Sequence, residues 1–231
     1  MLLKRLKIKQ NKLINLLKFS NKDLYFIKPN KELSPVGWHI LHCVFIECLW
    51  IRNYFLEDAS ITNKLQSIVD PLKIKPHARG KNLPDYFEII TFCKKIFNEN
   101  IEIISSLIVN KYDKKYSIEY IIKFLENHHA QHLETIKNIL NVLNIELNSK
   151  FHAYGCKILP IDYKFLPIKI KKGLYKIGTN KSFVYDNEKP ENKFRTNYFE
   201  ISKNYITIQN WKAFIEDGGY KNNKYWTKTS W

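Results

Sequence analysis

The sequence lacks any apolar segment of the length that crosses a membrane, and it lacks a secretory leader. No run of about 18 apolar residues occurs in the 231-residue chain, so a transmembrane helix is not expected. The first residues, MLLKRLKIKQNKLINLLKF, contain no uninterrupted apolar centre and no small-residue cleavage site, unlike a signal peptide. We therefore expect a cytoplasmic protein without a membrane partner.

Cysteine is scarce, and its spacing is not that of a disulfide framework or a redox motif. The chain has four cysteines, at positions 43, 48, 93 and 156, and no C-x-x-C pair. Reduced thiols in the cytoplasm are the simplest interpretation. Internal repeats and low-complexity tracts are also absent.

The composition is that of a globular protein with an excess of basic residues. Apolar residues make up 45% and charged residues 26% of the chain, enough for one large domain or two small ones. The formal net charge is +16, which would suit a nucleic-acid partner. However, the lysines are scattered among Asn and Ile rather than clustered, so the pattern favours a solvated surface, and nucleic-acid binding is not expected.

Hydrophobic periodicity predicts four helices in the first 145 residues, over approximately 3–19, 34–56, 84–108 and 117–143. Ser34 is expected to cap the second helix with Pro35 at its first position, and Ser117 to cap the fourth. Residues 70–84, rich in Pro and basic side chains, are expected to be a loop. Four such helices suggest a four-helix bundle.

The pattern changes after residue 150. The segments 173–179 and 197–207 bunch β-forming residues between turn residues, and Thr207 is expected to cap a short helix that Gly218 and Gly219 end. The expected class is therefore α+β, with one domain over residues 1–148 and a mixed unit over 149–231.

The stretch HHAQHLE, residues 128–134, places histidines within the fourth predicted helix. Continuing the apolar stripe from Leu125 brings His128 and His132 to the inward face, because positions i and i+4 project together. His129 is expected to point about 100° away, outside the site. Two inward imidazoles need hydrogen-bond partners or a metal, and ordinary core or surface histidines remain the alternative.

The second predicted helix supplies a third candidate ligand. Within GWHILHCVFIE, His42 lies on a stripe with Trp38 and Phe45, so it is preferred over His39 as the third ligand. Three histidines would leave coordination positions open, which favours catalysis over a closed structural site. Glu134 is either an acceptor for an imidazole N–H or a solvated charge, and Glu47 is either a ligand or an interhelical partner.

These residues resemble a known family. SPVGWHILHCVFIE followed by HHAQHLETIKNIL is similar to the DinB-like bundle of ergothioneine-type sulfoxide synthases, which carry W-H-x-x-H on one helix and H-x-x-x-H-x-E on another. From GLYKIGT to the terminal KYWTKTSW, the chain also looks like the opening of the formylglycine-generating-enzyme-like (sulfatase-modifying-factor-like) domain of these enzymes. The resemblance covers nearly the whole chain.

The resemblance implies a site and a reaction. His42, His128 and His132 would hold a non-haem iron(II), although zinc is not excluded by the residues. Gln131 would contact N-trimethylhistidine (hercynine), and Arg79 would bind carboxylates of the thiol substrate, unless it is a solvated loop arginine. The family joins cysteine or γ-glutamylcysteine to the imidazole of hercynine, uses O₂ at the iron and leaves a sulfoxide.

The resemblance also has a limit. In the family the second domain continues beyond the point that corresponds to Trp231, and that part carries a catalytic tyrosine. No catalytic residue is therefore assigned here. A truncated or split form is expected, whose missing half would be encoded separately. The alternatives are an inactive metal-binding remnant and a DinB-like thiol transferase or hydrolase that uses zinc or nickel.

Overall fold

The computed structural model of the chain describes residues 2–109, 115–143, 167–181 and 184–231. They form two compact units, a helical one followed by one of short strands and helices, and each is described by itself. This succession confirms the α+β class. The expected domain boundary at residues 148 and 149 lies outside the described residues.

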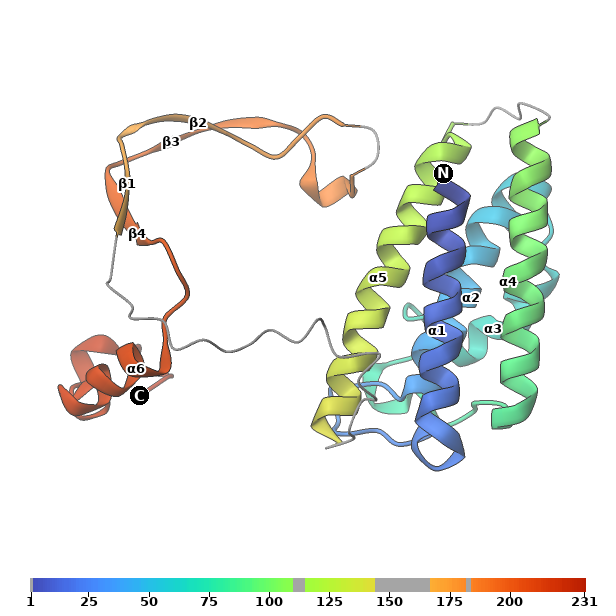
Figure 1. Ribbon diagram of the computed structural model, residues 1–231, viewed down its shortest axis with the longest axis horizontal. Coiled ribbons are helices and arrows are strands. Elements are labelled where there is room, and N and C mark those ends of the chain that lie inside the picture. Colours follow the sequence, from blue (N-terminus) through green and yellow to red (C-terminus); the bar gives the residue numbers. More distant parts are fainter. Residues whose placement is uncertain (1, 110–114, 144–166, 182–183) are drawn as a thin grey trace. The chain divides into compact units, whose positions relative to one another are not determined.

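The helical unit is a bundle of four long helices with a short helix added (Figure 1). Helix α1 packs against α2, α4 and α5, and α2 also packs against α3, α4 and α5. The bounds in chain order are α1 Leu2–Tyr25, α2 Val36–Cys48, the π-helix η1 Leu49–Leu56, α3 Ser60–Val69, the 3-10 turn η2 Pro76–Ala78, α4 Tyr86–Val109 and α5 Ile118–Val142.

The ends of the long helices differ from those predicted, most of all for α1, which continues to Tyr25, six residues beyond the expected end. Ser117 caps α5 as expected, because its side chain accepts a hydrogen bond from the backbone N–H of Tyr120. The predicted cap at Ser34 is wrong by one residue, since Pro35 holds the extended cap conformation and no side chain caps α2. The second predicted helix does extend to Leu56, but its last eight residues are π-helical.

The short helix α3 is a second difference from the prediction. Its sequence, SITNKLQSIV, is ten residues long and rich in Ser, Thr and Asn, which are weak helix formers. Its apolar residues at 61, 65, 68 and 69 nevertheless recur at helical spacing. Packing of this face against α2 stabilises a helix that propensity alone does not predict.

The end of α1 and the start of α2 come into very close contact. A Cβ on Gly37 would lie 2.1 Å from Cε2 of Tyr25, and the Tyr25 side chain is completely buried. No side chain larger than glycine fits there without moving the ring. This contact fixes the first turn of α2, which carries Trp38 and His39.

The interior of the bundle contains two apolar clusters with a polar layer between them. One cluster includes Leu6, Ile51, Ile104 and Leu125, and the other contains apolar residues of the same long helices on the far side of the layer. The polar layer consists of one buried side chain from each long helix, and its members are Gln10, Glu47, Asn100 and His129.

The second unit contains two antiparallel strand pairs in its described residues. Strand β1 (Pro167–Ile170) pairs with β4 (Phe199–Ser202), and β2 (Gly173–Ile177) pairs with β3 (Asn192–Thr196). Helix α6 (Ile208–Glu216) follows, and Thr207 forms a capping box with Asn210. The predicted segments 173–179 and 197–207 thus contain β2 and β4, whereas β1 and β3 were not predicted.

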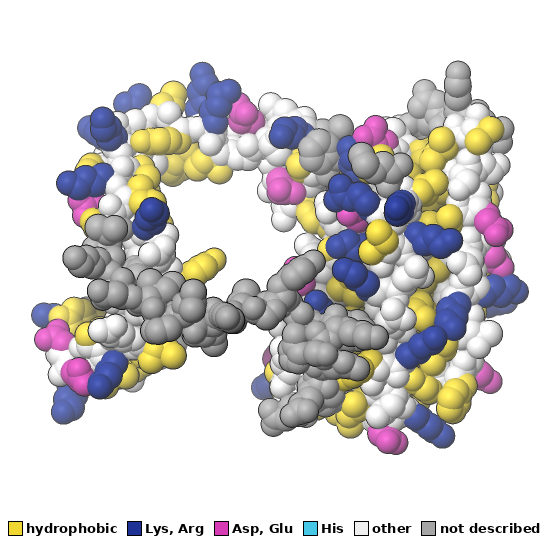
Figure 2. Space-filling model, viewed as in Figure 1, with side chains coloured by type: hydrophobic (Ala, Val, Ile, Leu, Met, Phe, Trp, Pro, Cys, Tyr) yellow, Lys and Arg dark blue, Asp and Glu magenta, His cyan; other side chains and the backbone are white. Residues whose placement is uncertain are grey.

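Two expectations from composition can be compared with the structure. None of the described helices is long and apolar enough to cross a membrane. On the face shown in Figure 2, Lys and Arg side chains are spread over the surface and interleaved with apolar and acidic ones rather than gathered into one patch. This distribution agrees with a solvated basic surface.

Candidate metal centre

The packing of α2 against α5 brings three histidines together. His42, His128 and His132 each offer a ring nitrogen, and these nitrogens lie within 4.8 Å of one another. The ring centroids are 5.2 Å apart for His42 and His128, 5.0 Å for His42 and His132, and 4.5 Å for His128 and His132. The i, i+4 spacing on α5 accounts for the last pair.

One nitrogen of each ring is already used. Nδ1 of His42 lies 3.0 Å from the carbonyl oxygen of Val69, so it must donate, because a carbonyl can only accept. Nδ1 of His132 lies 3.0 Å from Nδ1 of His39. Nδ1 of His128 has a longer contact, 3.5 Å, to Nδ1 of His129. The Nε2 atoms therefore remain as candidate donors to a metal, the arrangement that metal-binding histidines usually have.

Burial keeps these rings in the neutral form that binds metals. Desolvation lowers the pKa of His42 to about 4 and that of His128 to about 2. The pKa of His132 is lowered as well, first by burial and then by the neighbouring histidines. Three neutral imidazoles, whose Nε2 atoms have no hydrogen-bond partner among the described residues, fit a divalent transition metal and leave coordination positions open.

His39 is a neighbour of this group rather than part of it. It is buried, its Nε2 has no hydrogen-bond partner among the described residues, and desolvation lowers its pKa to about 3. For His132 to present a lone pair on Nε2, its Nδ1–H must donate to His39. From the sequence, His39 was the alternative to His42 as the third metal ligand. In the described residues, the histidine that joins His128 and His132 in the group of three nitrogens is His42.

The lowered pKa values predict that the metal-free bundle loses stability in acid. The pKa of His42 is about 4 in the folded protein against 6.5 for a free histidine. Below pH 6.5 the unfolded chain therefore binds more protons than the folded one, and the free energy of unfolding falls until the pH reaches the folded pKa. Each such histidine contributes up to about 1.4 kcal/mol per pH unit.

We expect urea midpoints measured in EDTA to be steady above about pH 7 and to fall steeply towards about pH 4. The variant His77→Ala, which lacks an exposed histidine, should follow the wild-type curve. A midpoint that does not change over this range would contradict the burial of neutral rings.

An aromatic and basic wall adjoins His42. The Trp38 ring stacks on the His42 ring with centroids 4.9 Å apart and an interplanar angle of 7°. The guanidinium carbon of Arg79 lies 4.3 Å from the centroid of Trp38, a cation–π distance, and Arg79 Nε donates to the carbonyl of Ile74. The predicted loop thus places Arg79 one ring away from the candidate centre.

The other residues singled out from the sequence lie at the surface of α5. Gln131 and Glu134 are both exposed, and the carbonyl oxygen of Gln131 accepts a hydrogen bond from Thr135. The substrate contact expected of Gln131 stays a prediction.

His129 was misplaced by the sequence reasoning. It is completely buried, and its Nε2 lies 2.7 Å from Oε1 of Glu47, which is also completely buried. At about 100° per residue, an ideal helix places His129 about 40° and His128 about 60° from Leu125, on opposite sides. In the structure His129 is the one that faces the core, and His128 and His132 are only partly buried. For Glu47, the sequence allowed either a metal ligand or an interhelical partner. The structure shows the second, because Glu47 on α2 is hydrogen-bonded to His129 on α5.

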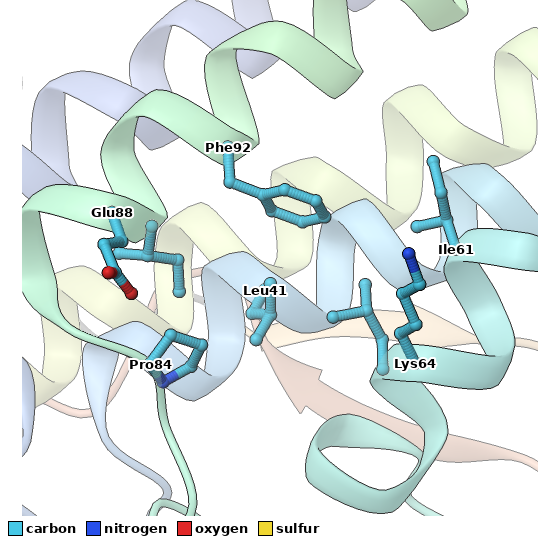
Figure 3. A pocket seen from close by; sticks show the side chains of 8 residues that line it. Leu41, Ile61, Lys64, Pro84, Glu88 and Phe92 are labelled. Atoms are coloured by element: carbon cyan, nitrogen blue, oxygen red, sulfur yellow. The ribbon is translucent and has the colours of Figure 1, made fainter.

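A pocket elsewhere in the bundle is distinct from this centre. Its volume is about 260 Å³, and Figure 3 shows Leu41 at its floor between residues of α3 and α4. It contains no histidine, and its polar groups are one ammonium and one carboxylate. Its lining residues are Leu41, Ile61, Lys64, Leu65, Pro84, Glu88, Ile89 and Phe92.

Comparisons with known proteins add to this geometry. Residues 167–231 match the family described as Sulfatase-modifying factor enzyme 1-like domain. The chain is 22% identical over 240 aligned positions to a hercynine oxygenase of Mycolicibacterium thermoresistibile, with 96% of this chain and 49% of that protein covered. It thus spans about half the length of this relative. The chain is therefore similar to part of a hercynine oxygenase, and its last 65 residues are similar to a sulfatase-modifying-factor domain.

Proposed function

We propose that this chain belongs to an ergothioneine-type sulfoxide synthase, in which iron(II) and O₂ serve C–S bond formation between a thiol and hercynine. The observation that carries the proposal is the group of three histidines whose Nδ1 atoms are engaged and whose Nε2 atoms remain available. The similarity to a hercynine oxygenase along 96% of the chain gives this group its proposed chemistry.

The metal would be held by His42, His128 and His132. When bound, iron(II) would supply the site for O₂ and for the sulfur of cysteine or γ-glutamylcysteine. The protein's own contribution would be a preformed set of neutral donors, because burial disfavours their protonation. The engaged Nδ1 atoms would hold each ring in one orientation.

Two further residues are proposed to contact substrates. Arg79 would attract a carboxylate of the thiol substrate, because its guanidinium lies against Trp38 near the centre and forms charge-assisted hydrogen bonds readily. Gln131 would contact hercynine from the exposed rim of α5. The proton donor is left unassigned.

The second unit is proposed to complete its fold with further polypeptide, either in the same chain or as a separately encoded half. Many of its apolar side chains are exposed, a state that complete domains avoid. Among them are Ile168, Leu174, Ile177, Phe194, Phe199, Ile201, Ile206, Ile208, Trp211 and Ile215.

The test is a reconstituted reaction. The protein, together with the polypeptide that completes its second domain, would be loaded with iron(II) without oxygen and mixed with hercynine and either thiol. We expect a sulfoxide product by mass spectrometry only after O₂ is admitted. Loss of product with zinc in place of iron would serve as the metal control.

The results would also separate the alternatives. No sulfoxide from iron-loaded, folded protein would overturn the proposed reaction. Tight zinc binding with thiol transfer or hydrolysis that does not depend on oxygen would favour a DinB-like transferase or hydrolase instead, because three histidines alone do not separate zinc from iron.

A further inference from the structure

Glu47 is a completely buried carboxyl group whose neighbours can all donate to it. Gln10 Nε2 lies 2.8 Å from its Oε1, Asn100 Nδ2 lies 3.0 Å from its Oε2, and His129 Nε2 lies 2.7 Å from its Oε1. These donors come from α1, α4 and α5. A carboxylate accepts all three hydrogen bonds, whereas a protonated carboxyl would place its own hydrogen against one of the donors.

This arrangement determines where the proton of His129 lies. Because Nε2 of His129 donates to Glu47, the neutral ring has its lone pair on Nδ1. That lone pair faces Nδ1 of His128 at 3.5 Å. The hydrogen of neutral His128 is then held on Nδ1, and Nε2 carries the free lone pair.

We propose that Glu47 and His129 are positioning residues that hold His128 with its Nε2 lone pair available to the metal. The inference rests on the metal centre of the proposed function. His42 is held by a backbone carbonyl and His132 by another imidazole, and His128 depends on the relay from Glu47 through His129. The contact to His128 is the longest of the three, so its tautomer is the one most sensitive to the buried pair.

Two alternative arrangements of His128 and His129 compete with the proposal and can be tested against it. Cys43, His128 and His129 also offer ligand atoms within 4.8 Å of one another, and burial raises the pKa of the Cys43 thiol. An imidazolium at His129 is a second rival, because its Nδ1–H would donate to His128 and move the hydrogen of His128 to Nε2.

The first experiment uses the wild-type chain without metal. Nitrogen-15 NMR of the imidazole rings at about pH 7.5 distinguishes a protonated from a bare ring nitrogen. We expect His128 to be protonated on Nδ1 and bare on Nε2, and His129 to show the reverse. The opposite tautomer of His128 would overturn the proposal, and this measurement needs no variant to fold.

The second experiment removes only the acceptor that faces His128. In His129→Gln the side-chain amide can still donate to Glu47, but the imidazole Nδ1 is lost. We expect the affinity for cobalt(II), used as the metal probe, to fall about 10- to 100-fold. The matched control is Gln10→Met, which removes another donor to Glu47 and should leave the cobalt affinity within about twofold of wild type.

The outcomes separate this inference from the proposed function. Unchanged cobalt affinity in His129→Gln, or an equal loss in Gln10→Met, would overturn the positioning role. A thiolate-to-cobalt absorption band that disappears in Cys43→Ser would assign the metal to the rival group. A wild-type chain that shows the expected tautomers and binds no metal would leave the buried relay in place and refute the metal centre.

Discussion

Replacing His132 by alanine is expected to lower the affinity for a divalent metal by more than about 100-fold, beyond the usual effect of losing a residue that only orients a ligand. The variant loses one of three nitrogen donors and also the partner of Nδ1 of His39. The helix should persist, because His132 is only partly buried on α5 and alanine has the highest helix propensity. Metal content after purification and competition with a chromophoric chelator measure the change.

The control for this prediction is His77→Ala. His77 is exposed in η2, so its loss should leave metal content unchanged. Metal content in His132→Ala equal to that of wild type would refute the assignment of the centre.

Replacing Glu47 by leucine is expected to reduce the free energy of unfolding of the helical unit by at least about 3 kcal/mol. The substitution leaves N–H groups of Gln10, Asn100 and His129 buried without their acceptor, and each such group costs roughly 1–3 kcal/mol. Guanidinium unfolding in EDTA measures the change without a contribution from bound metal.

A matched substitution on the surface tests whether this loss comes from burial. Glu134 is exposed on α5, so Glu134→Leu should change the free energy of unfolding by no more than about 0.5 kcal/mol. If Glu47→Leu lowered the free energy of unfolding by as little as Glu134→Leu, the hydrogen bonds of the polar layer would not stabilise the fold.

The helices could be predicted where the helical segment itself contains an apolar stripe or a capping residue. Long apolar stripes and the cap at Ser117 predict the second, third and fourth long helices to within two residues, whereas α1 continues six residues beyond its predicted end. Helix α3 was not predicted because its ten residues combine weak helix formers with a short apolar face. Whether such a segment is helical depends on its tertiary packing. The strands β1 and β3 are only four and five residues long, at the short limit of the length over which alternation predicts a strand.

The candidate site was predictable in its ligand set and not in its supporting contacts. The spacing of His128 and His132 and the stripe through His42 follow from helical geometry. The partners of their Nδ1 atoms come from elsewhere in the fold, such as the carbonyl of Val69 at the end of α3. A backbone carbonyl leaves no trace in a sequence pattern. The burial of His129 was missed because, counted from Leu125, steps of three and of four residues miss the helical period by comparable angles in opposite directions, about 60° and about 40°.

The hydrogen bond between His42 and the carbonyl of Val69 therefore restricts the length of α3. Val69 is the last residue of the helix, and the final carbonyls of a helix have no partner within it, which is why this one can accept from His42. One residue inserted into α3 would turn its last carbonyl by about 100° and shift it by about 1.5 Å. The hydrogen bond from His42 would thus survive insertions directly after Asp70 and not insertions within the ten residues of the helix, although none of those ten is itself a candidate ligand.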